Sequence, residues 1–200
     1  MSVKKNKSPK INIDYKKLRK LEPTKNAFAS LVRSIIFQQL SGKAAQSILN
    51  KFLKLWPNKK FPKPEDVLIL KDKDFRNSGV SLQKANYLRD LSKKFIDKTI
   101  NLKKFSKITD EEIREHLIQV KGIGRWTADM FLIFALNRPN VLPVGDLAIV
   151  KGFQKLWNLN TVPTEEKMRE LAKDFDGEHT YLSLYLWNVM DEMKEKKNSK

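Results

Sequence analysis

Apolar residues recur at helical spacing along almost the whole chain, and this pattern restricts the fold more than any other feature. No stretch alternates with the two-residue period of a half-buried strand, and no internal repeat is visible. Helices are predicted over residues 26–40, 43–56, 62–70, 81–96, 125–137, 147–157 and 164–175, with one more starting at a capping box, Thr109 to Glu112, and a last one after Gly177. We therefore expect an all-α fold of roughly nine or ten short helices.

The positive charge of the chain lies partly in its predicted folded body. The sequence has 40 Lys and Arg against 23 Asp and Glu, a formal net charge of +17 over 200 residues. Residues 1–25 carry +7 and residues 192–200 carry +2, which leaves +8 for residues 26–191. A body with this charge suits a polyanion such as nucleic acid, because neutralised phosphates release their counterions. A solvated, lysine-rich surface is the alternative interpretation.

The composition excludes several classes of site. Cysteine is absent, so the chain has no disulfide, thiolate zinc site, iron–sulfur cluster or cysteine nucleophile. The only two histidines, His116 and His179, are far apart in sequence, which argues against a histidine-built metal site. The N-terminus lacks an apolar signal segment, and no apolar run is long enough to cross a membrane. We expect an intracellular protein, in the cytoplasm or nucleoid of a prokaryote or the nucleus of a eukaryote.

The segment Val120-Lys-Gly-Ile-Gly-Arg-Trp-Thr-Ala128 predicts a glycine hairpin between two helices. Glycine permits positive φ and leaves no side chain between the backbone amides and an approaching group. The amides around Gly122, Ile123, Gly124 and Arg125 also lie at the positive end of the next helix, which suits a DNA phosphate. A tight helix–helix turn with a glycine C-cap is the alternative.

Asp146, in Leu142-Pro-Val-Gly-Asp146, is the candidate catalytic carboxylate. The helix predicted at 125–137 is about 20 Å long, and the linker 138–145 can span up to about 28 Å. Asp146 can therefore return to the neighbourhood of the hairpin. It also opens a predicted helix, whose dipole favours a negative charge. The alternative is a purely structural role, because an aspartate at a helix start is usually an N-cap and nothing more.

Three separated motifs, in order, give the chain a specific resemblance to a known family. They are Ile35-Ile-Phe-Gln-Gln-Leu-Ser-Gly-Lys-Ala-Ala45, the hairpin segment up to Asp129, and Leu142 to Asp146, supplemented by Tyr185-Leu-Trp187. Over about residues 26–192 the chain resembles the helix-hairpin-helix DNA glycosylases, in particular the 3-methyladenine DNA glycosylase II branch. The resemblance implies two helical lobes with a cleft between them, and extrusion of a damaged nucleotide from duplex DNA into that cleft.

The resemblance also implies roles at matching positions. Asp146 matches the catalytic aspartate. Leu40, with Ser41 beside it, matches the wedge that fills the gap left by the flipped nucleotide. The hairpin carbonyls of Ile118, Val120 and Gly122 match those that hold a monovalent cation, Na⁺ or K⁺, and no cofactor is required for the chemistry.

Aromatic residues complete the implied site. Trp126 and Trp187 match walls of the base pocket, and Met130 stands where a relative has tyrosine. Residues of the types of Leu40, Met130 and Trp187 are otherwise usual in a core. Family members that also cleave the DNA strand carry a Schiff-base lysine at position 126. Tryptophan cannot form that base, so the resemblance implies a monofunctional enzyme and disfavours an oxidised-guanine glycosylase with lyase activity.

The predicted organisation is a basic, partly disordered tail over 1–25, a glycosylase domain of two helical lobes over 26–195, and a disordered tail over 196–200. Some relatives have a separate N-terminal β-rich domain; about 25 residues precede the first motif here, so we expect that domain to be missing. The expected partner is double-stranded DNA with alkylated bases, bound by a monomer, with no membrane. The main alternative is a non-catalytic helix-hairpin-helix module that only binds DNA.

Overall fold

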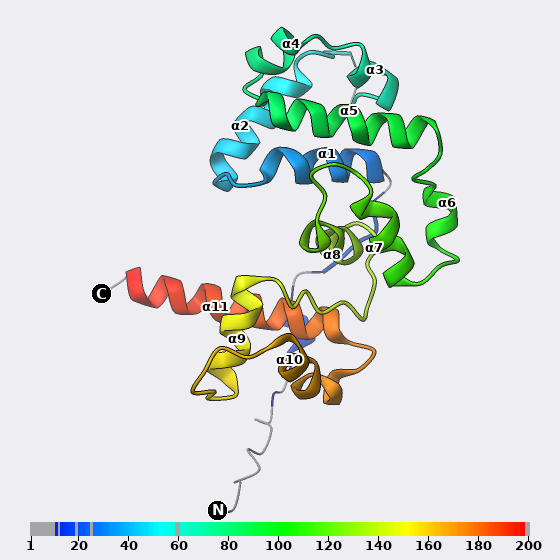
Figure 1. The fold of residues 1–200 in the computed structure, drawn as a ribbon. Helices are drawn as coiled ribbons and strands as arrows, with labels where there is room; N and C mark the ends of the chain where they lie inside the picture. The colour runs from blue at the N-terminus through cyan, green and yellow to red at the C-terminus, as the bar shows by residue number, and fades with distance from the viewer. Residues whose placement is uncertain (1–10, 12, 19, 25, 59–60, 199–200) are drawn as a thin grey trace, which may run out of the picture. The chain divides into compact units, whose positions relative to one another are not determined.

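All of the regular secondary structure described for the chain is helical (Figure 1). The computed structural model describes residues 11, 13–18, 20–24, 26–58 and 61–198, and within these ranges it has eleven α-helices, two 3₁₀ turns and no strand. The all-α prediction is confirmed. The elements are η1 (Tyr15–Lys17), α1 (Ala27–Phe37), α2 (Gly42–Leu53), α3 (Pro64–Leu68), α4 (Asp72–Asn77), α5 (Leu82–Ile96), α6 (Leu102–Phe105), α7 (Asp110–Ile118), α8 (Arg125–Phe134), α9 (Leu147–Leu156), α10 (Glu165–Leu171), η2 (Lys173–Phe175) and α11 (His179–Asn198).

The chain divides into two compact units. The first, called here the hairpin unit, is Pro23–Leu136 and contains α1 to α8. The second, called the aspartate unit, combines the residues up to Glu22 with Asn137–Lys200 and contains η1, α9, α10, η2 and α11. The glycine hairpin belongs to the first unit and Asp146 to the second.

Helix α5 is the central support of the hairpin unit, where α1, α3 and α4 all pack against it. It starts at Ser81, whose side chain accepts a hydrogen bond from the Lys84 amide. Ala85, Leu88 and Leu91 then recur every three residues and are fully buried. This spacing places one continuous apolar stripe against the neighbouring helices, which is what holds a short helix in place.

The aspartate unit has a separate core between α9 and α11. Phe153 and Trp157 stack with ring centroids 4.8 Å apart, next to the buried Leu182 and Leu186. Ile13 is only 6% exposed in the same core. Part of the predicted N-terminal tail, 1–25, thus contributes to a folded core; its residues 1–10, 12, 19 and 25 lie outside the described residues.

Several helix boundaries differ from the predicted ones. The first helix ends at Phe37 instead of residue 40, because Gln38 is extended and Gln39 has a φ of 56°. Helices α4 and α6 were not predicted, since they are too short to show a period. The last helix continues to Asn198, beyond the predicted boundary at 195, through a run of good helix formers; residues 199–200 are outside the described part.

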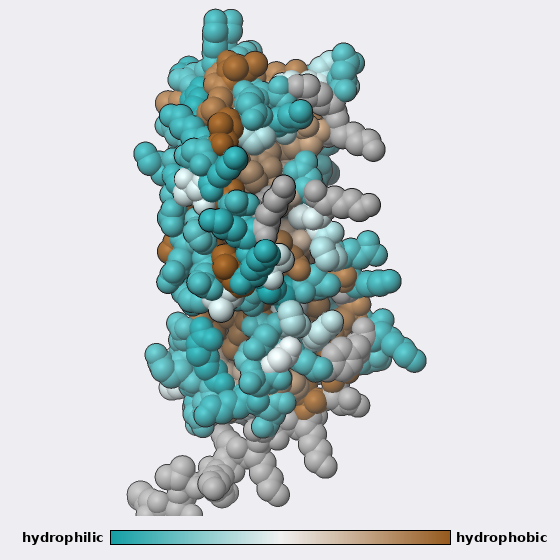
Figure 2. Space-filling view, turned by 90° about the vertical axis from the view of Figure 1, so that its right-hand side faces the viewer, coloured by the Kyte–Doolittle hydropathy of each residue, from teal (hydrophilic) through white to brown (hydrophobic). Residues whose placement is uncertain are grey.

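Hydrophilic side chains predominate on the face shown in Figure 2, with apolar side chains between them. No helix in the described ranges is both long and apolar enough to cross a membrane.

Candidate active site and hairpin

The hairpin between α7 and α8 is closed by a glycine turn. The amide of Ile123 donates to the carbonyl of Val120 at 3.0 Å, and Gly122 between them has a φ of 82°. A positive φ at the third position of such a turn strongly favours glycine. Because the Ile123 amide is engaged inside the turn and its side chain is buried, the phosphate contact predicted for Ile123 is not available from that N–H.

The two glycines of the hairpin have different reasons to be glycine. A Cβ on Gly122 would overlap the Tyr87 ring, so folding itself requires glycine there. A Cβ on Gly124 would meet nothing within 4 Å, and its φ of −96° suits any residue. Gly124 is the N-cap of α8 and offers no side chain to the first turn. An approaching anion can therefore come close to the backbone at this helix end.

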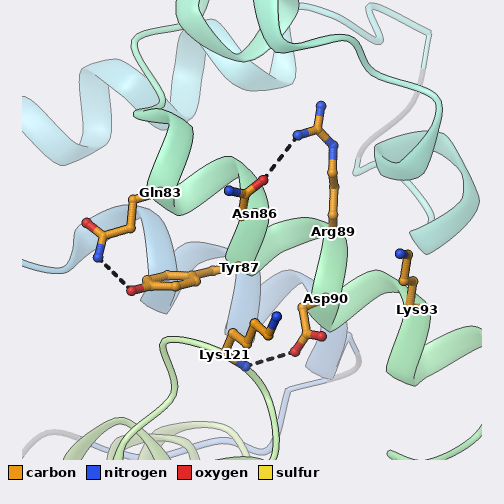
Figure 3. Close-up of a pocket in the computed structure, with 7 residues that line it drawn as sticks. All are labelled: Gln83, Asn86, Tyr87, Arg89, Asp90, Lys93 and Lys121. Atoms are coloured by element: carbon orange, nitrogen blue, oxygen red, sulfur yellow. Dashed lines mark hydrogen bonds between the residues drawn. The ribbon is translucent and has the colours of Figure 1, made fainter.

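The hairpin lies against α5, which contacts it through Asp90 (Figure 3). Asp90 accepts a hydrogen bond from the Lys121 amide at 2.8 Å and pairs with Lys94 Nζ at 2.9 Å. Burial raises the pKa of Asp90, but the bonds from Lys94 and Lys121 outweigh it and leave that pKa below its usual 3.8. A hollow of about 370 Å³ opens between α5 and the hairpin, with Arg89 and Lys93 also in its lining.

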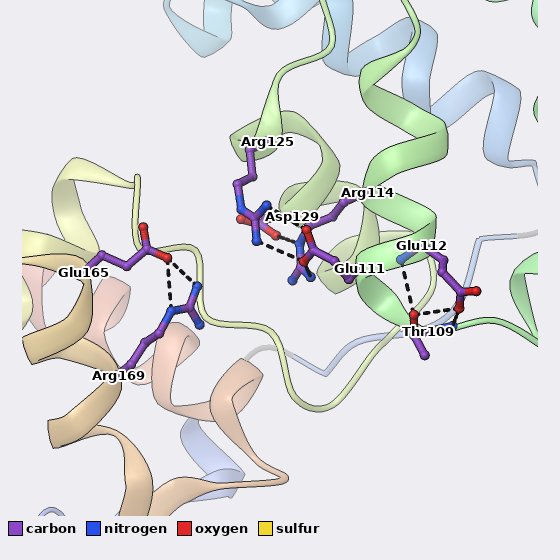
Figure 4. Close-up of polar contacts among 8 residues, drawn as sticks. All are labelled: Thr109, Glu111, Glu112, Arg114, Arg125, Asp129, Glu165 and Arg169. Carbon is purple, nitrogen blue, oxygen red and sulfur yellow. Dashed lines mark hydrogen bonds and ion pairs between the residues drawn. The ribbon is translucent and has the colours of Figure 1, made fainter.

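A network of ion pairs fixes α7 to α8 (Figure 4). Both terminal guanidinium nitrogens of Arg125 donate to Glu111, at 2.8 and 2.9 Å, so this side chain is committed to α7. Arg114 bonds Glu111 and also the buried Asp129, the latter at 2.6 Å. Burial raises the pKa of Asp129 and Arg114 opposes that rise, whereas the bond from Arg125 lowers the pKa of Glu111.

The capping box predicted at the start of α7 is confirmed. The Thr109 amide donates to Glu112 Oε2 at 2.7 Å, and the Glu112 amide donates to Thr109 Oγ1 at 3.2 Å (Figure 4). Helix α7, which leads into the hairpin, therefore has a side-chain cap at its start.

The wedge candidate Leu40 lies in the tight connection between α1 and α2. It is 39% exposed and follows Gln39, whose left-handed backbone turns the chain. Ser41, next in sequence, is the N-cap of α2 and accepts from the Ala44 amide. The pocket candidates Trp126 and Met130 lie one turn apart on α8, the first 45% exposed and the second half-buried. Their spacing puts both on one face of that helix.

Asp146 sits at the N-cap of α9 with its carboxylate held by three donors. The amides of Ala148 and Ile149 donate to Oδ1 at 2.9 and 3.0 Å, and the indole Nε1–H of Trp187 donates to the same oxygen at 3.1 Å. The N-cap interpretation is thus confirmed, and the structure brings two predicted site residues, Asp146 and Trp187, into direct contact. Oδ1 fixes the side chain, and the carboxylate is half-buried at the positive end of a helix.

Two of the three carbonyls predicted to hold a cation already accept hydrogen bonds. Val120 accepts from Ile123, and Gly122 accepts from Gln38 Nε2 at 2.7 Å. A carbonyl oxygen has two lone pairs, so each can still fit a monovalent cation as well. In the described part of the chain no cluster of three or more His, Asp or Glu side chains could hold a metal ion.

Sequence reasoning missed four residues that support these loops, namely Gln38, Lys84, Tyr87 and Asp90. Lys84 Nζ donates to the carbonyls of Ile36 and Gln38, both at 2.8 Å, and burial lowers the pKa of this lysine from its usual 10.5. Gln38 lies within the first of the three sequence motifs, but its partner is 84 residues away in sequence. No local pattern could have indicated it.

Residues 32–175 match the family described as HhH-GPD superfamily base excision DNA repair protein. This match covers well over half of the chain. The chain belongs to that family. The hairpin and the helix-capping aspartate described above fall within the matched segment of this HhH-GPD protein.

Two relatives with similar sequences are named for 3-methyladenine glycosylase activity. The chain is 37% identical over 183 residues to DNA-3-methyladenine glycosylase 1 of Schizosaccharomyces pombe, covering 88% of this chain and 77% of that protein. It is 30% identical to a putative DNA-3-methyladenine glycosylase of Bacillus subtilis, covering 83% of this chain and 60% of that relative.

Two solved structures have the same fold. A 3-methyladenine DNA glycosylase of Schizosaccharomyces pombe in complex with abasic DNA aligns with a TM-score of 0.74 and 33% identity, covering 86% of this chain and 87% of that one. A DNA-3-methyladenine glycosidase from Bacillus halodurans aligns with a TM-score of 0.80 and 32% identity, covering 88% and 81%.

Proposed function

We propose that this protein is a monofunctional DNA glycosylase that removes alkylated purines from duplex DNA by hydrolysing their N-glycosidic bond. The observation that carries the proposal is the carboxylate of Asp146, fixed through Oδ1 by two helix amides and the Trp187 indole. The named activity of relatives that match more than four fifths of the chain supports the same reaction. The proposed substrates are 3-methyladenine and 7-methylguanine, together with hypoxanthine and etheno-adenine at lower rates.

Asp146 supplies the charge that the reaction needs. Cleavage of a glycosidic bond passes through an oxocarbenium-like sugar that is positively charged near C1′. A fixed negative charge close to that carbon stabilises the transition state more than the neutral ground state. The same carboxylate orients the attacking water or removes its proton. The base departs with the electron pair of the broken bond, and water supplies the new C1′–O bond.

The two tryptophans favour cationic bases. A purine alkylated at N3 or N7 is already positively charged, so it leaves without a strong general acid. Trp126 and Trp187 each offer an indole, and a cation on an indole face gains up to about 2 kcal/mol when desolvated. Neutral lesions lack that gain. We expect their excision to be slower by as much as about thirtyfold.

Trp126 also limits the chemistry to hydrolysis. An indole has no amine that could form a Schiff base with the sugar, which strand-cleaving relatives need. We therefore assign no lyase activity, and abasic sites in intact strands are the expected product.

The hairpin unit binds the DNA backbone. Gly122, Gly124 and Arg125 offer their backbone to a phosphate, and Leu40, beside Ser41, fills the space of the flipped nucleotide. A Na⁺ or K⁺ ion on the carbonyls of Ile118, Val120 and Gly122 would add positive charge at the phosphate. The protein acts as a monomer on double-stranded DNA.

The test is release of free base from methylated duplex DNA. We expect 3-methyladenine and 7-methylguanine in the soluble fraction and strands that break only after alkali treatment. A covalent complex trapped by borohydride would contradict the monofunctional assignment. Tight binding to the duplex with no base release would leave a DNA-binding module without catalysis.

A further inference from the structure

One face of α5 supports both loops that the proposed function assigns to DNA. Lys84, Tyr87 and Asp90 are spaced three residues apart and so project from the same side of the helix. Lys84 binds the end of α1, and Asp90 binds the hairpin amide of Lys121. The Tyr87 ring lies directly against Gly122, where it fills the space that a Cβ would need.

Lys84 fixes the start of the wedge segment, residues 38–41. Its ammonium group donates to the carbonyls of Ile36 and Gln38, which lie at the C-terminus of α1 and have no further helical partner. A cation at this end also complements the helix dipole. The chain then turns at Gln39 and re-enters a helix at the Ser41 N-cap. Leu40 therefore lies between two residues that are held in place, Gln38 and Ser41.

Gln38 joins this segment to the hairpin. Its side-chain amide donates to the Gly122 carbonyl at 2.7 Å and lies 3.5 Å from Thr127 Oγ1 in the first turn of α8. The Gln38 side chain is half-buried, so water competes less for this bond. Gln38 thus accepts a hydrogen bond from Lys84 at its backbone oxygen and donates one to the hairpin from its side chain.

We propose that Gln38 and Lys84 are positioning residues that couple the Leu40 wedge to the phosphate-binding hairpin. Neither the wedge segment nor the hairpin can shift without breaking a hydrogen bond to the other or to α5. Binding of a DNA phosphate by the hairpin and insertion of Leu40 into the duplex then occur as one event. Preorganised loops lose less conformational entropy on binding. The inference rests on the proposed function for the role of Leu40, and it adds the residues that set the position of Leu40.

The experiment compares two substrates with the same lesion. In the first, 3-methyladenine lies in a fully paired duplex; in the second, it lies in an unpaired bubble, where most of the cost of separating the base from the helix is already met. Gln38→Ala should slow single-turnover release from the paired duplex by about tenfold, the effect of one lost hydrogen bond. Release from the bubble should change by less than about twofold.

Further variants separate positioning from folding. Lys84→Met should reproduce the Gln38→Ala pattern, and Lys84→Arg, which keeps a cation at the same carbonyls, should restore most of the paired-duplex rate. The matched control is Gln46→Ala on α2, whose amide bonds only Arg33 and Asn50 among the hydrogen bonds described for it. This variant should behave as wild type on both substrates.

Fluorescence of 2-aminopurine beside the lesion gives an independent measure of flipping. Wild type should raise the fluorescence on binding, and Gln38→Ala should bind with a reduced rise. Equal slowing of Gln38→Ala on both substrates, or no slowing on either, would overturn the coupling. If wild type releases no base at all, the proposed function fails, and the fluorescence comparison still decides whether Gln38 controls flipping.

Discussion

The two units of this protein present their functional groups in opposite ways. In the hairpin unit the candidate contact with the DNA phosphate is backbone, and side chains such as Tyr87, Asp90 and Gln38 hold that backbone in place. In the aspartate unit the candidate group is one side chain, and backbone amides hold it. The difference predicts opposite sensitivities. Added side-chain atoms should damage the first unit, and removal of a single charge should damage the second.

The largest expected effect is from Asp146→Asn. Asparagine is as good an N-cap as aspartate, so Oδ1 can still accept from Ala148 and Ile149 and the fold should persist. The negative charge is lost, and we expect single-turnover release of 3-methyladenine to fall about a thousandfold or more. Circular dichroism and thermal unfolding serve as the fold controls. A rate within tenfold of wild type would remove Asp146 from the chemistry.

Gly124→Asp should give the next largest effect, on affinity. Aspartate is a favoured N-cap and no atom lies in the way, so the hairpin unit should be as stable as wild type or more so. A carboxylate at this helix end repels a phosphate, and DNA binding should weaken about tenfold to a hundredfold, measured by fluorescence anisotropy. Gly124→Asn is the neutral control of the same size and should lose less. Equal affinity of all three proteins would place the DNA elsewhere.

Within the hairpin, Gly122 should differ from Gly124 because a side chain at Gly122 should affect stability. Gly122→Ala places a Cβ against Tyr87 at a φ of 82°. Unlike Gly124→Asp, it should lower the free energy of unfolding, by about 2–4 kcal/mol in urea titrations, from backbone strain and displacement of the ring. An unchanged unfolding midpoint would show that Tyr87 is not a support of the turn.

Trp187→Phe should have a smaller effect on catalysis. Phenylalanine keeps an aromatic wall but lacks the N–H that donates to Asp146 Oδ1. We expect the single-turnover rate to fall about tenfold, as for one lost hydrogen bond to a charged group. Trp157→Phe is the matched control, because its buried Nε1 has no hydrogen-bond partner among the described residues. Similar rates of base release for both variants would mean that the hydrogen bond from Trp187 to Asp146 does not contribute to catalysis.

The smallest effect concerns Asp90 and depends on pH. Its folded pKa lies below the usual 3.8, because its bonds to Lys94 and Lys121 outweigh burial. The ionised group therefore stabilises the fold above that usual pKa, and the stabilisation is lost as the pH falls through the lowered folded pKa. Asp90→Asn should cost about 1 kcal/mol of unfolding free energy at pH 7, and this cost should shrink as the pH falls below the lowered pKa of Asp90. A difference that is constant with pH would contradict the ionic role of Asp90.

Periodicity predicted the fold well because most helices are long enough to show an apolar stripe. It failed for α4, which buries only Phe75, and for the end of α1, where Gln39 adopts a left-handed backbone. The glycine hairpin and the capping role of Asp146 followed from local sequence. The bond from Gln38 to Gly122 and the bond from Trp187 to Asp146 join distant positions, and no short-range pattern encodes such contacts.

The central claim is that the hairpin unit binds DNA and the aspartate unit carries out the chemistry. One titration carried out on two variants tests this claim most directly. Gly124→Asp and Asp146→Asn are each titrated against a duplex containing 3-methyladenine, and the dissociation constant and the limiting rate of base release at saturation are read together. We predict that Gly124→Asp binds weakly and reaches nearly the wild-type limiting rate, and that Asp146→Asn binds as wild type and releases almost no base. Loss of rate and affinity together in both variants would contradict separate roles for the two units.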